Sequence, residues 1–571
     1  MIKKPTRLTV RLETVTHSFH RDLAPSRVWA YDGHLPGPTI EVERGSGVEV
    51  QWENRLSGPL PVLATQAPTH AEDGVPVQCL PGRSGGALDP NAAALSGYAV
   101  VHLHGALTQA TSDGWTENLI APGQDALDSY QNDQRAALLW YHDHVMGITR
   151  FNVYAGLAGL WIVRDARERE LELPEGPPYE LPLLLADRNF DTASDGSLTG
   201  ELVHKTDPDV MECFSPFTTV NGVIWPRVDV EPTTYRFRVL NGSNARTYRL
   251  VLTREGQPDQ ERITQIGSDG GLLVAPARIP LQGLVVASAE RADILIDFSG
   301  LALGTELTLW NNAAAPFNGA FADPSTAGRP DLEGLLPYPE VLLFRVIDGR
   351  RGGRRPPAVL ATDFQRADRG QLNGCVVRAI ALVEQESNRQ GQPSTLTMRE
   401  LTQEGATDEP VITLVEAGAG QPGQTSRWRT AATRFEDKTN FFPVLGQPEI
   451  WRLINLTGDT HPIHVHLDAF QVLSRQPAVV EIPDGGITDT DTSATVRIGQ
   501  QADDHIPHSV DENELGLKDT VRVNANEVVD ILVRFETFAG RYMYHCHILE
   551  HEDHDMMRPF VVMPGELMPF M

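Results

Sequence analysis

Short runs in which apolar and polar residues alternate recur along the whole chain. Three of them, VEVQWEN at 48–54, YRFRVLN at 235–241 and EIWRLIN at 449–455, end in Asn and follow a lead-in punctuated by Gly or Pro. A period of two residues predicts a half-buried β-strand. We therefore expect that the same first strands of a β-sandwich domain occur three times along the chain. The alternative is chance similarity among amphipathic strands.

A second internal match pairs two stretches that contain histidines. Residues 140–163 (WYHDHVMGITRFNVYAGLAGLWIV) and 543–563 (MYHCHILEHEDHDMMRPFVVM) share an aromatic residue, His, a variable residue and His, followed by an apolar strand. Asp143 of the first copy stands where Cys546 stands in the second. The match indicates that the first and last parts of the chain are related repeats.

Charged stretches rich in Gly or Pro at 164–178 and 348–357 are candidate linkers. A chain of 571 residues is too long for one ordinary core, and helical periodicity is sparse. We expect an all-β protein of three β-sandwich domains, at residues 1–170, 178–348 and 358–571.

The composition, with 41% hydrophobic and 22% charged residues, is that of a soluble globular protein. A formal net charge of −28 argues against nucleic acid and anionic membranes as partners. No segment has the apolar length needed to span a bilayer, and no apolar run follows the basic start of the chain. We therefore expect no membrane partner and no signal peptide.

Histidines gather at the two ends of the chain. Ten of the 18 fall in four short motifs: HLHG (His102, His104), WYHDH (His142, His144), HPIHVH (His461, His464, His466) and HCHILEH (His545, His547, His551). Two motifs belong to the first expected domain, two to the third and none to the middle one. Residues i and i+2 of a strand point to the same face. One such pair is usually a polar strand, but four pairs split evenly over two repeats predict a metal site between these domains.

Cys546 lies between His545 and His547, so on a strand its sulfur points to the opposite face. There His551, Met556 and His461 can complete a second site. Two His and one Cys with a weak axial Met form the ligand set of a blue-copper electron-transfer centre. Zinc is the alternative for two His and one Cys, although a zinc site has no use for the neighbouring imidazole pairs.

The other cysteines, Cys79, Cys213 and Cys375, are too few for a disulfide framework in so long a chain. We expect buried free thiols, and one pairing among them stays open.

The motifs resemble those of the multicopper oxidases over essentially the whole chain. HLHG followed by SDGW, then NDQRAALLWYHDH, TTVNGVIWP, QIGSDGGLL, NELGLKD and HCHILEHEDHDMMRPF are most similar to the bacterial subgroup of spore-coat laccases, bilirubin oxidases and phenoxazinone synthases. DGWTENLIAPG and RTAATRF favour phenoxazinone synthase. The resemblance implies three cupredoxin-like (Greek-key β-sandwich) domains.

The resemblance also implies four coppers per chain: one type 1, one type 2 and two type 3. The implied type 1 ligands are His461, Cys546, His551 and axial Met556. The implied type 2 ligands are His102 and His464. The implied type 3 ligands are His104, His142, His144, His466, His545 and His547. Asp143 is consistent with a first repeat whose own type 1 site lost its cysteine.

Two carboxylates occupy positions to which the family assigns proton delivery, Glu552 directly after a type 1 ligand and Asp113 in the TSDGW loop. Reduction of dioxygen to water consumes protons, so an acid must reach a dry site. The alternative is that Glu552 and Asp113 only orient histidines and waters.

The resemblance implies an oxidase that takes single electrons from aromatic donors, such as phenols, aminophenols or bilirubin-like compounds, at the type 1 copper and reduces dioxygen to water. Loops at roughly 365–430 and 475–518 are expected to shape the donor pocket. A Cu(I)-oxidising copper-resistance enzyme, a non-catalytic coat or scaffold protein and a nitrite reductase are the alternatives. The missing signal peptide suggests a cytoplasmic or spore-associated location.

The axial ligand supplies a test. An apolar residue in place of a thioether destabilises the oxidised copper, so Met556→Leu should raise the type 1 reduction potential. A redox titration of the wild-type and Met556→Leu proteins measures this potential. A potential that does not rise would remove Met556 from the ligand set.

Overall fold

The computed structural model of the protein describes residues 1–67, 79–206, 211–319, 338–385, 395–403, 412–418, 421–483, 486–487, 493–500 and 509–570. Strands dominate these residues. Their α-helices are four short segments: α1 (Pro90–Ala93), α2 (Thr149–Ala155), α3 (Ala166–Glu170) and α4 (Leu549–Glu552). The predicted all-β class is confirmed.

Two sheets form the N-terminal repeat, with the strand orders β1-β4-β10-β9-β7 and β3-β2-β5-β8. The strands are β1 (Ile2–Lys3), β2 (Arg7–His17), β3 (Ser26–Tyr31), β4 (Gly37–Glu43), β5 (Val48–Arg55), β7 (Val101–His104), β8 (Asp125–Tyr130), β9 (Ala137–Asp143) and β10 (Ala158–Arg164). Between the sheets lies a hydrophobic core that includes Trp29, Trp52 and Trp161.

Two larger sheets form the middle repeat, with the orders β15-β14-β11-β17-β23-β20-β21 and β16-β25-β24-β18-β19, and β22 pairs with β18. The strands are β11 (Glu180–Arg188), β14 (Phe217–Val220), β15 (Val223–Ile224), β16 (Arg227–Val230), β17 (Thr234–Asn241), β18 (Tyr248–Arg254), β19 (Gln257–Pro258), β20 (Ile263–Ser268), β21 (Gly271–Arg278), β22 (Leu284–Val286), β23 (Arg291–Asp297), β24 (Glu306–Asn311) and β25 (Glu340–Val346). A small sheet joins the first two repeats, because β6 (Val62–Gln66) pairs with β13 (Leu198–Thr206), which pairs with β12 (Phe190–Thr192).

The C-terminal repeat consists of a closed barrel, β26-β27-β29-β28-β33-β32-β35-β30, and a sheet, β34-β31-β36-β37. The strands are β26 (Val376–Gln385), β27 (Thr395–Gln403), β28 (Ile412–Gly418), β29 (Gln421–Ala432), β30 (Glu449–Asn455), β31 (His461–Val465), β32 (Gln471–Glu481), β33 (Ala494–Ile498), β34 (Thr520–Val523), β35 (Glu527–Val533), β36 (Gly540–Cys546) and β37 (Met557–Val562). The stretch 365–430, expected to be loop, is therefore mostly barrel strand in its described part.

The three predicted Asn-terminated strands are β5, β17 and β30, and they occupy equivalent places. Each pairs in parallel with the first long strand of its repeat, β2, β11 or β26. Each also pairs antiparallel with a later strand, β8, β23 or β35. The predicted threefold occurrence of the same first strands is confirmed by this pairing.

The terminal asparagines repeat the same hydrogen bonds. In Asn54, Asn241 and Asn455 the side-chain oxygen accepts a bond from the backbone N–H two residues later, at 3.0, 3.0 and 2.8 Å. Each side-chain nitrogen donates to at least two backbone carbonyls of neighbouring segments. Asparagine supplies both functions in one small side chain, which explains why the residue recurs at this position.

The expectation of a half-buried strand is wrong for β17, which is buried along its whole length. Arg236 and Arg238 are 1% exposed, and they lie in a cluster of ion pairs with Glu168, Glu180 and Asp293. The period of two marks the polar positions of β17 correctly, but charge pairing lets both faces be covered. Glu168 belongs to the charged stretch 164–178, so part of this candidate linker is packed.

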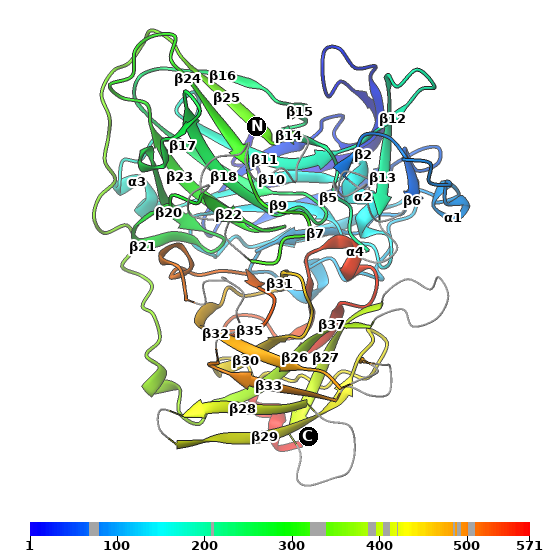
Figure 1. The fold of residues 1–571 in the computed structure, drawn as a ribbon, viewed down its shortest axis with the longest axis vertical. Coiled ribbons are helices and arrows are strands. Elements are labelled where there is room, and N and C mark those ends of the chain that lie inside the picture. Colours follow the sequence, from blue (N-terminus) through cyan, green and yellow to red (C-terminus); the bar gives the residue numbers. More distant parts are fainter. Residues whose placement is uncertain are drawn as a thin grey trace.

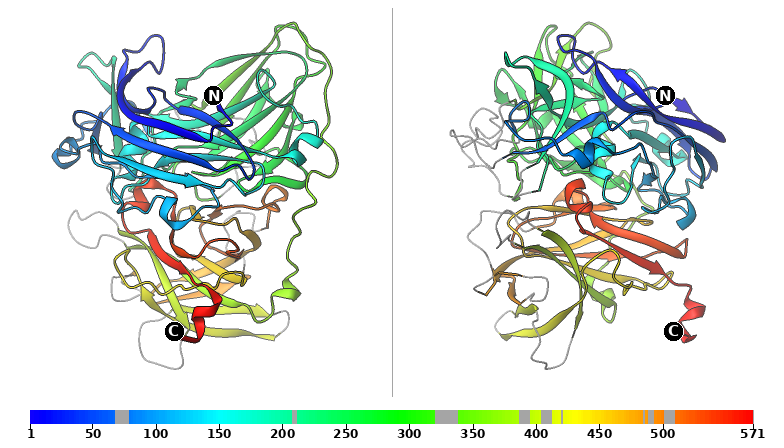
Figure 2. Two further views of the ribbon diagram at one scale, coloured as in Figure 1. Left: turned by 180° about the vertical axis from the view of Figure 1, so that it is seen from behind. Right: turned by 90° about the vertical axis from the view of Figure 1, so that its right-hand side faces the viewer.

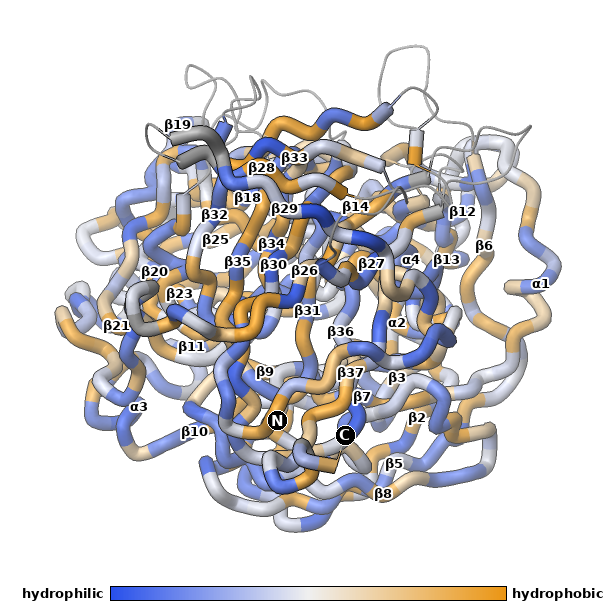
Figure 3. Tube along the Cα trace, turned by 90° about the horizontal axis from the view of Figure 1, so that it is seen from below, coloured by the Kyte–Doolittle hydropathy of each residue, from blue (hydrophilic) through white to orange (hydrophobic). Residues whose placement is uncertain are grey.

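The repeats are arranged in two tiers. The first two repeats lie side by side in the upper half of Figure 1 and the third lies below them, with α4 and β31 where the tiers meet. The chain after β25 descends along one side of the molecule to the lower tier (Figures 1 and 2). Figure 3 shows apolar stretches along β31 and β35 of the lower tier. No described helix has the length and apolar character needed to cross a membrane.

The repeated asparagine supplies a stability test in the repeat that carries no histidine motif. Asn241→Ala leaves the carbonyls of Arg246 and Val286 and the N–H of Ser243 without their side-chain partner. We expect the free energy of unfolding to fall by about 2–4 kcal/mol, measured by urea unfolding. Asn118→Ala, at an exposed position, is the control, and equal midpoints for both variants would contradict the role of Asn241.

Candidate metal centre

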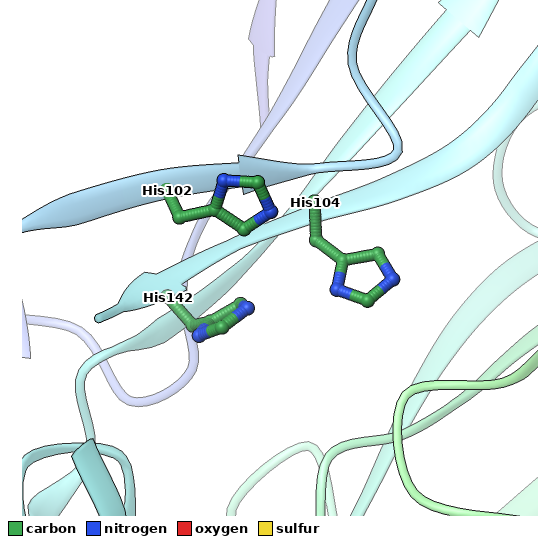
Figure 4. Close-up of side chains that lie close together, drawn as sticks. All are labelled: His102, His104 and His142. Carbon is green, nitrogen blue, oxygen red and sulfur yellow. The ribbon is translucent and has the colours of Figure 1, made fainter. Parts of the chain in front are cut away.

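Two antiparallel strand pairs present the histidines of the first and third repeats. In the first repeat β7 pairs with β9, and His102 lies opposite His142. In the third repeat β31 pairs with β36, and His464 lies opposite His545. Figure 4 shows His102, His104 and His142 on these two strands of the first repeat, with their rings close together.

The rings of the two repeats interleave between the strand pairs. The ring centroids of His104 and His464 are 3.6 Å apart, and those of His102 and His466 are 4.0 Å apart. The eight paired histidines are all at most 1% exposed: His102, His104, His142, His144, His464, His466, His545 and His547. The structure therefore brings all four predicted pairs into one buried space.

The nitrogens of these rings show which atoms can bind a metal. Nδ1 of His102, His142 and His464 lie 2.6, 2.9 and 2.8 Å from backbone carbonyl oxygens. A carbonyl only accepts, so Nδ1 carries the proton and Nε2 keeps its lone pair. These three Nε2 atoms are buried and have no hydrogen-bond partner among the described residues. A metal ion would satisfy lone pairs that are otherwise costly to bury.

Burial also sets the charge state of the cluster. It lowers the pKa of His102, His142 and His464 well below the usual value, and the neighbouring rings lower it further. The imidazoles are therefore neutral near pH 7, which is the form that binds metal ions.

A second group surrounds Cys546. Its Sγ lies 3.7 Å from Nδ1 of His461 and 3.8 Å from Nδ1 of His551. Met556 is fully buried in the same hydrophobic cluster. Burial raises the pKa of the Cys546 thiol well above its usual value, so the thiolate needs a bound cation to form. Two imidazoles, a thiolate and a nearby thioether fit copper.

The two groups lie on opposite faces of one strand. Cys546 packs in the core of the third repeat with Trp451 and Phe560. Its neighbour His545 faces the first repeat, where its Nε2 lies 3.3 Å from Nε2 of His144. The alternation expected from the sequence therefore separates the sulfur from the imidazole cluster.

Comparison with known proteins identifies the family to which this architecture belongs. Two multicopper oxidase domain models match the chain, one at residues 13–86 and 90–168 and the other at 407–566. The laccase of Bacillus subtilis (strain 168) is 35% identical over 576 residues, covering 98% of this chain and 94% of that protein. The chain belongs to the multicopper oxidase family.

Two further similarities agree. The bilirubin oxidase of Albifimbria verrucaria is 30% identical over 559 residues, covering 96% of this chain and 75% of that protein. The crystal structure of the multicopper oxidase of the hyperthermophile Aquifex aeolicus has a TM-score of 0.66 and 26% identity, covering 98% of this chain and 97% of that one. This multicopper oxidase is thus a copper-binding, oxygen-dependent enzyme of laccase type, with small-molecule substrates and a three-domain cupredoxin-like fold. The similarity to phenoxazinone synthase stays a prediction.

Both predicted carboxylates contact the histidine cluster of the oxidase. Glu552 lies 3.1 Å from Nδ1 of His545 and 3.4 Å from Nδ1 of His144. Asp113 lies 2.9 Å from Nδ1 of His466. Burial raises the pKa of Asp113 well above its usual value. Burial also raises the pKa of Glu552, but His545 and His144 outweigh it and hold that pKa at about 2. The contacts fit an orienting role, and proton delivery stays a prediction.

Three residues at the site carry no signal in the sequence pattern. The carboxylate of Asp519 lies 3.0 Å from Nε2 of His104. Thr457 Oγ1 lies 2.7 Å from Nε2 of His461. Glu212 Oε1 lies 3.5 Å from Nε2 of His551. Asp519 ends the NELGLKD stretch, which the sequence singles out only by similarity, and Glu212 comes from the repeat without histidine motifs.

The remaining cysteines partly meet expectation. Cys79, Cys213 and Cys375 are all free thiols. The first two are buried, as predicted, but Cys375 is only half-buried, because it directly precedes the exposed first residues of β26. His204, which lies in the sequence between the two pairs of histidine motifs, has its Nε2 within hydrogen-bond distance of Glu550 Oε1, at 2.8 Å.

The hydroxyl of Thr457 supplies a test of how His461 is oriented. Because Nδ1 of His461 faces the sulfur, its Nε2 carries the proton and donates to Thr457 Oγ1. Thr457→Val leaves this donor unpaired, so we expect the free energy of unfolding to fall by about 1–3 kcal/mol and the reduction potential at this site to rise, because the imidazole becomes a poorer electron donor. Thr457→Ser retains the hydroxyl and should match wild type in both measurements. A Val variant that matches it too would refute this orientation.

Proposed function

We propose that this multicopper oxidase takes single electrons from small aromatic donors, such as phenols, aminophenols or bilirubin-like tetrapyrroles, and reduces dioxygen to water. The names of the laccase and bilirubin oxidase relatives support this donor class. The observation that carries the proposal is the position of His551, whose ring lies between the sulfur of Cys546 and the carboxyl group of Glu212.

Four coppers per chain would be held by the residues described above. The type 1 ligands would be His461, Cys546, His551 and Met556, the type 2 ligands His102 and His464, and the type 3 ligands His104, His142, His144, His466, His545 and His547. When bound, these coppers supply the one-electron chemistry that couples donor oxidation to the four-electron reduction of dioxygen.

Glu212 accounts for the choice of an aromatic hydroxyl or amine as donor. Such a donor loses a proton as well as an electron. Glu212 is 2% exposed, and its Oε2 has no hydrogen-bond partner among the described residues. The other oxygen, Oε1, lies 3.5 Å from Nε2 of His551, the ring nitrogen remote from the sulfur, so the ionised carboxylate can accept the proton of a donor that approaches this ring.

The backbone of β36 then connects the two metal-binding groups. Cys546 is bonded through single peptide units to His545 and His547. Glu552 and Asp113, which contact the histidine cluster at 3.1 and 2.9 Å, would hold or supply the protons that dioxygen reduction consumes.

The experiment compares donors that differ in their protons. With copper-loaded protein, we expect oxygen uptake with 2-aminophenol, and we expect Glu212→Gln to lower kcat/KM for 2-aminophenol about 100-fold. Ferrocyanide gives up an electron without a proton, so its kcat/KM should be unchanged in Glu212→Gln. Glu201→Gln, at an exposed position, is the matched control.

Other outcomes would point elsewhere. An equal loss for both donors would show that Glu212 acts on His551 and not on the donor. Faster turnover of Cu(I) than of 2-aminophenol would favour a copper-resistance oxidase. Copper-loaded protein that is colourless and consumes no oxygen with any aromatic donor would refute the proposed function.

A further inference from the structure

We infer that Arg291, from the middle repeat that has no copper ligand of its own, is a positioning residue for the trinuclear copper site and acts through Asp519 on His104. This inference rests on the proposed function, in which His104 is a copper ligand.

Arg291 lies where the three repeats meet. It is the first residue of β23 and is 2% exposed. Its Nη1 donates to Asp519 Oδ1 at 2.6 Å, and its Nη2 donates to Asp519 Oδ2. Its Nε donates to the carbonyl of Leu138 at 3.1 Å, on the strand that carries His142. One guanidinium thus links the middle repeat to the first and third, in the bidentate geometry that only arginine offers.

Asp519 in turn contacts two stacked imidazole rings, those of His104 and His464. Its Oδ1 accepts a hydrogen bond from Nε2 of His104 at 3.0 Å, and its backbone carbonyl accepts one from Nδ1 of His464 at 2.8 Å. Because a carboxylate paired with arginine accepts, Nε2 of His104 carries the proton and Nδ1 keeps the lone pair. Nδ1 of His104 is buried and has no hydrogen-bond partner among the described residues.

His104 therefore differs from three of its neighbours in the cluster. His102, His142 and His464 are oriented through Nδ1 by backbone carbonyls. His104 is oriented through Nε2 by a side chain, and a side chain must itself be fixed. Arg291 supplies that restraint, since both oxygens of Asp519 receive a guanidinium donor.

Gly105 provides independent support. It follows His104 with φ +84°, and a Cβ there would lie 2.7 Å from Asp519 Oδ2 and 2.9 Å from Arg291 Nη2. The glycine of HLHG thus leaves the space that the ion pair occupies. Asp269 also restrains Arg291, because its Oδ1 accepts a hydrogen bond from the backbone N–H of Arg291 at 2.8 Å.

The test separates positioning from ordinary stability. Arg291→Met keeps the length of the side chain but leaves Asp519 without its cation, and Asp519→Asn keeps the shape but removes the charge. For both we expect copper affinity to fall about 10- to 100-fold, measured by chelator competition, with a changed type 2 electron paramagnetic resonance signal and an unchanged blue absorption. Arg291→Lys should recover part of the affinity.

Arg236→Met is the matched control, because Arg236 is an equally buried middle-repeat arginine paired with Asp293 and makes no contact with a proposed ligand in the described structure. It should lower the unfolding midpoint while keeping wild-type copper affinity and spectra. Should Arg291→Met fail to fold, Asp519→Asn and Arg291→Lys carry the measurement.

The two proposals fail in different ways. Folded Arg291→Met and Asp519→Asn with wild-type copper affinity and type 2 signal would overturn this inference alone. A blue absorption lost together with the type 2 signal would also overturn it, by showing a general structural effect. Wild-type protein that takes up no copper would instead refute the proposed function.

Discussion

The alternation of side chains along β36 is the constraint on which the site depends. Cys546 points into the core of the third repeat, and His545 and His547 point toward the first. A shift of the strand by one residue would exchange sulfur and imidazoles. The register is fixed on both sides, since β36 pairs with β37 over most of its length and with β31 at residues 544–546. The first repeat must then lie against the histidine face, and its own strand pair completes the cluster.

The middle repeat has no histidine motif, yet it borders both metal-binding groups. Glu212 lies 3.5 Å from His551, Asn244 donates at 2.7 Å to Glu550, the residue before His551 in α4, and Arg291 pairs with Asp519. These residues are charged or amide side chains buried at the contact between repeats. Such groups persist in an interior only when they are paired, so the middle repeat orients groups that the outer repeats supply.

Sequence periodicity predicts the strands and the histidine pairs because both depend on local geometry. β5, β17 and β30 follow from a period of two, and His102 with His104 follows from the same rule. The contacts of Asp519 with His104 and of Glu212 with His551 could not be predicted from local patterns. In each contact the two residues belong to different repeats and are separated by hundreds of residues along the chain. The buried charges of β17 and the strands of the third-repeat barrel were missed for a related reason: long-range pairing decides which polar faces are covered.

The comparison of Asp143 with Cys546 shows how one repeat keeps the geometry without the metal ligand. Asp143 Oδ1 accepts the backbone N–H of Val145 at 3.1 Å, as Cys546 Sγ accepts that of Ile548 at 3.5 Å. Burial raises the pKa of Asp143 to about 8, and the N–H groups of Val100, Val145 and Asn152 donate to its oxygens, so the core holds this carboxyl group without a cation. The same turn therefore directs the following histidine of each repeat into the shared cluster, and only the repeat with sulfur retains the second metal-binding group.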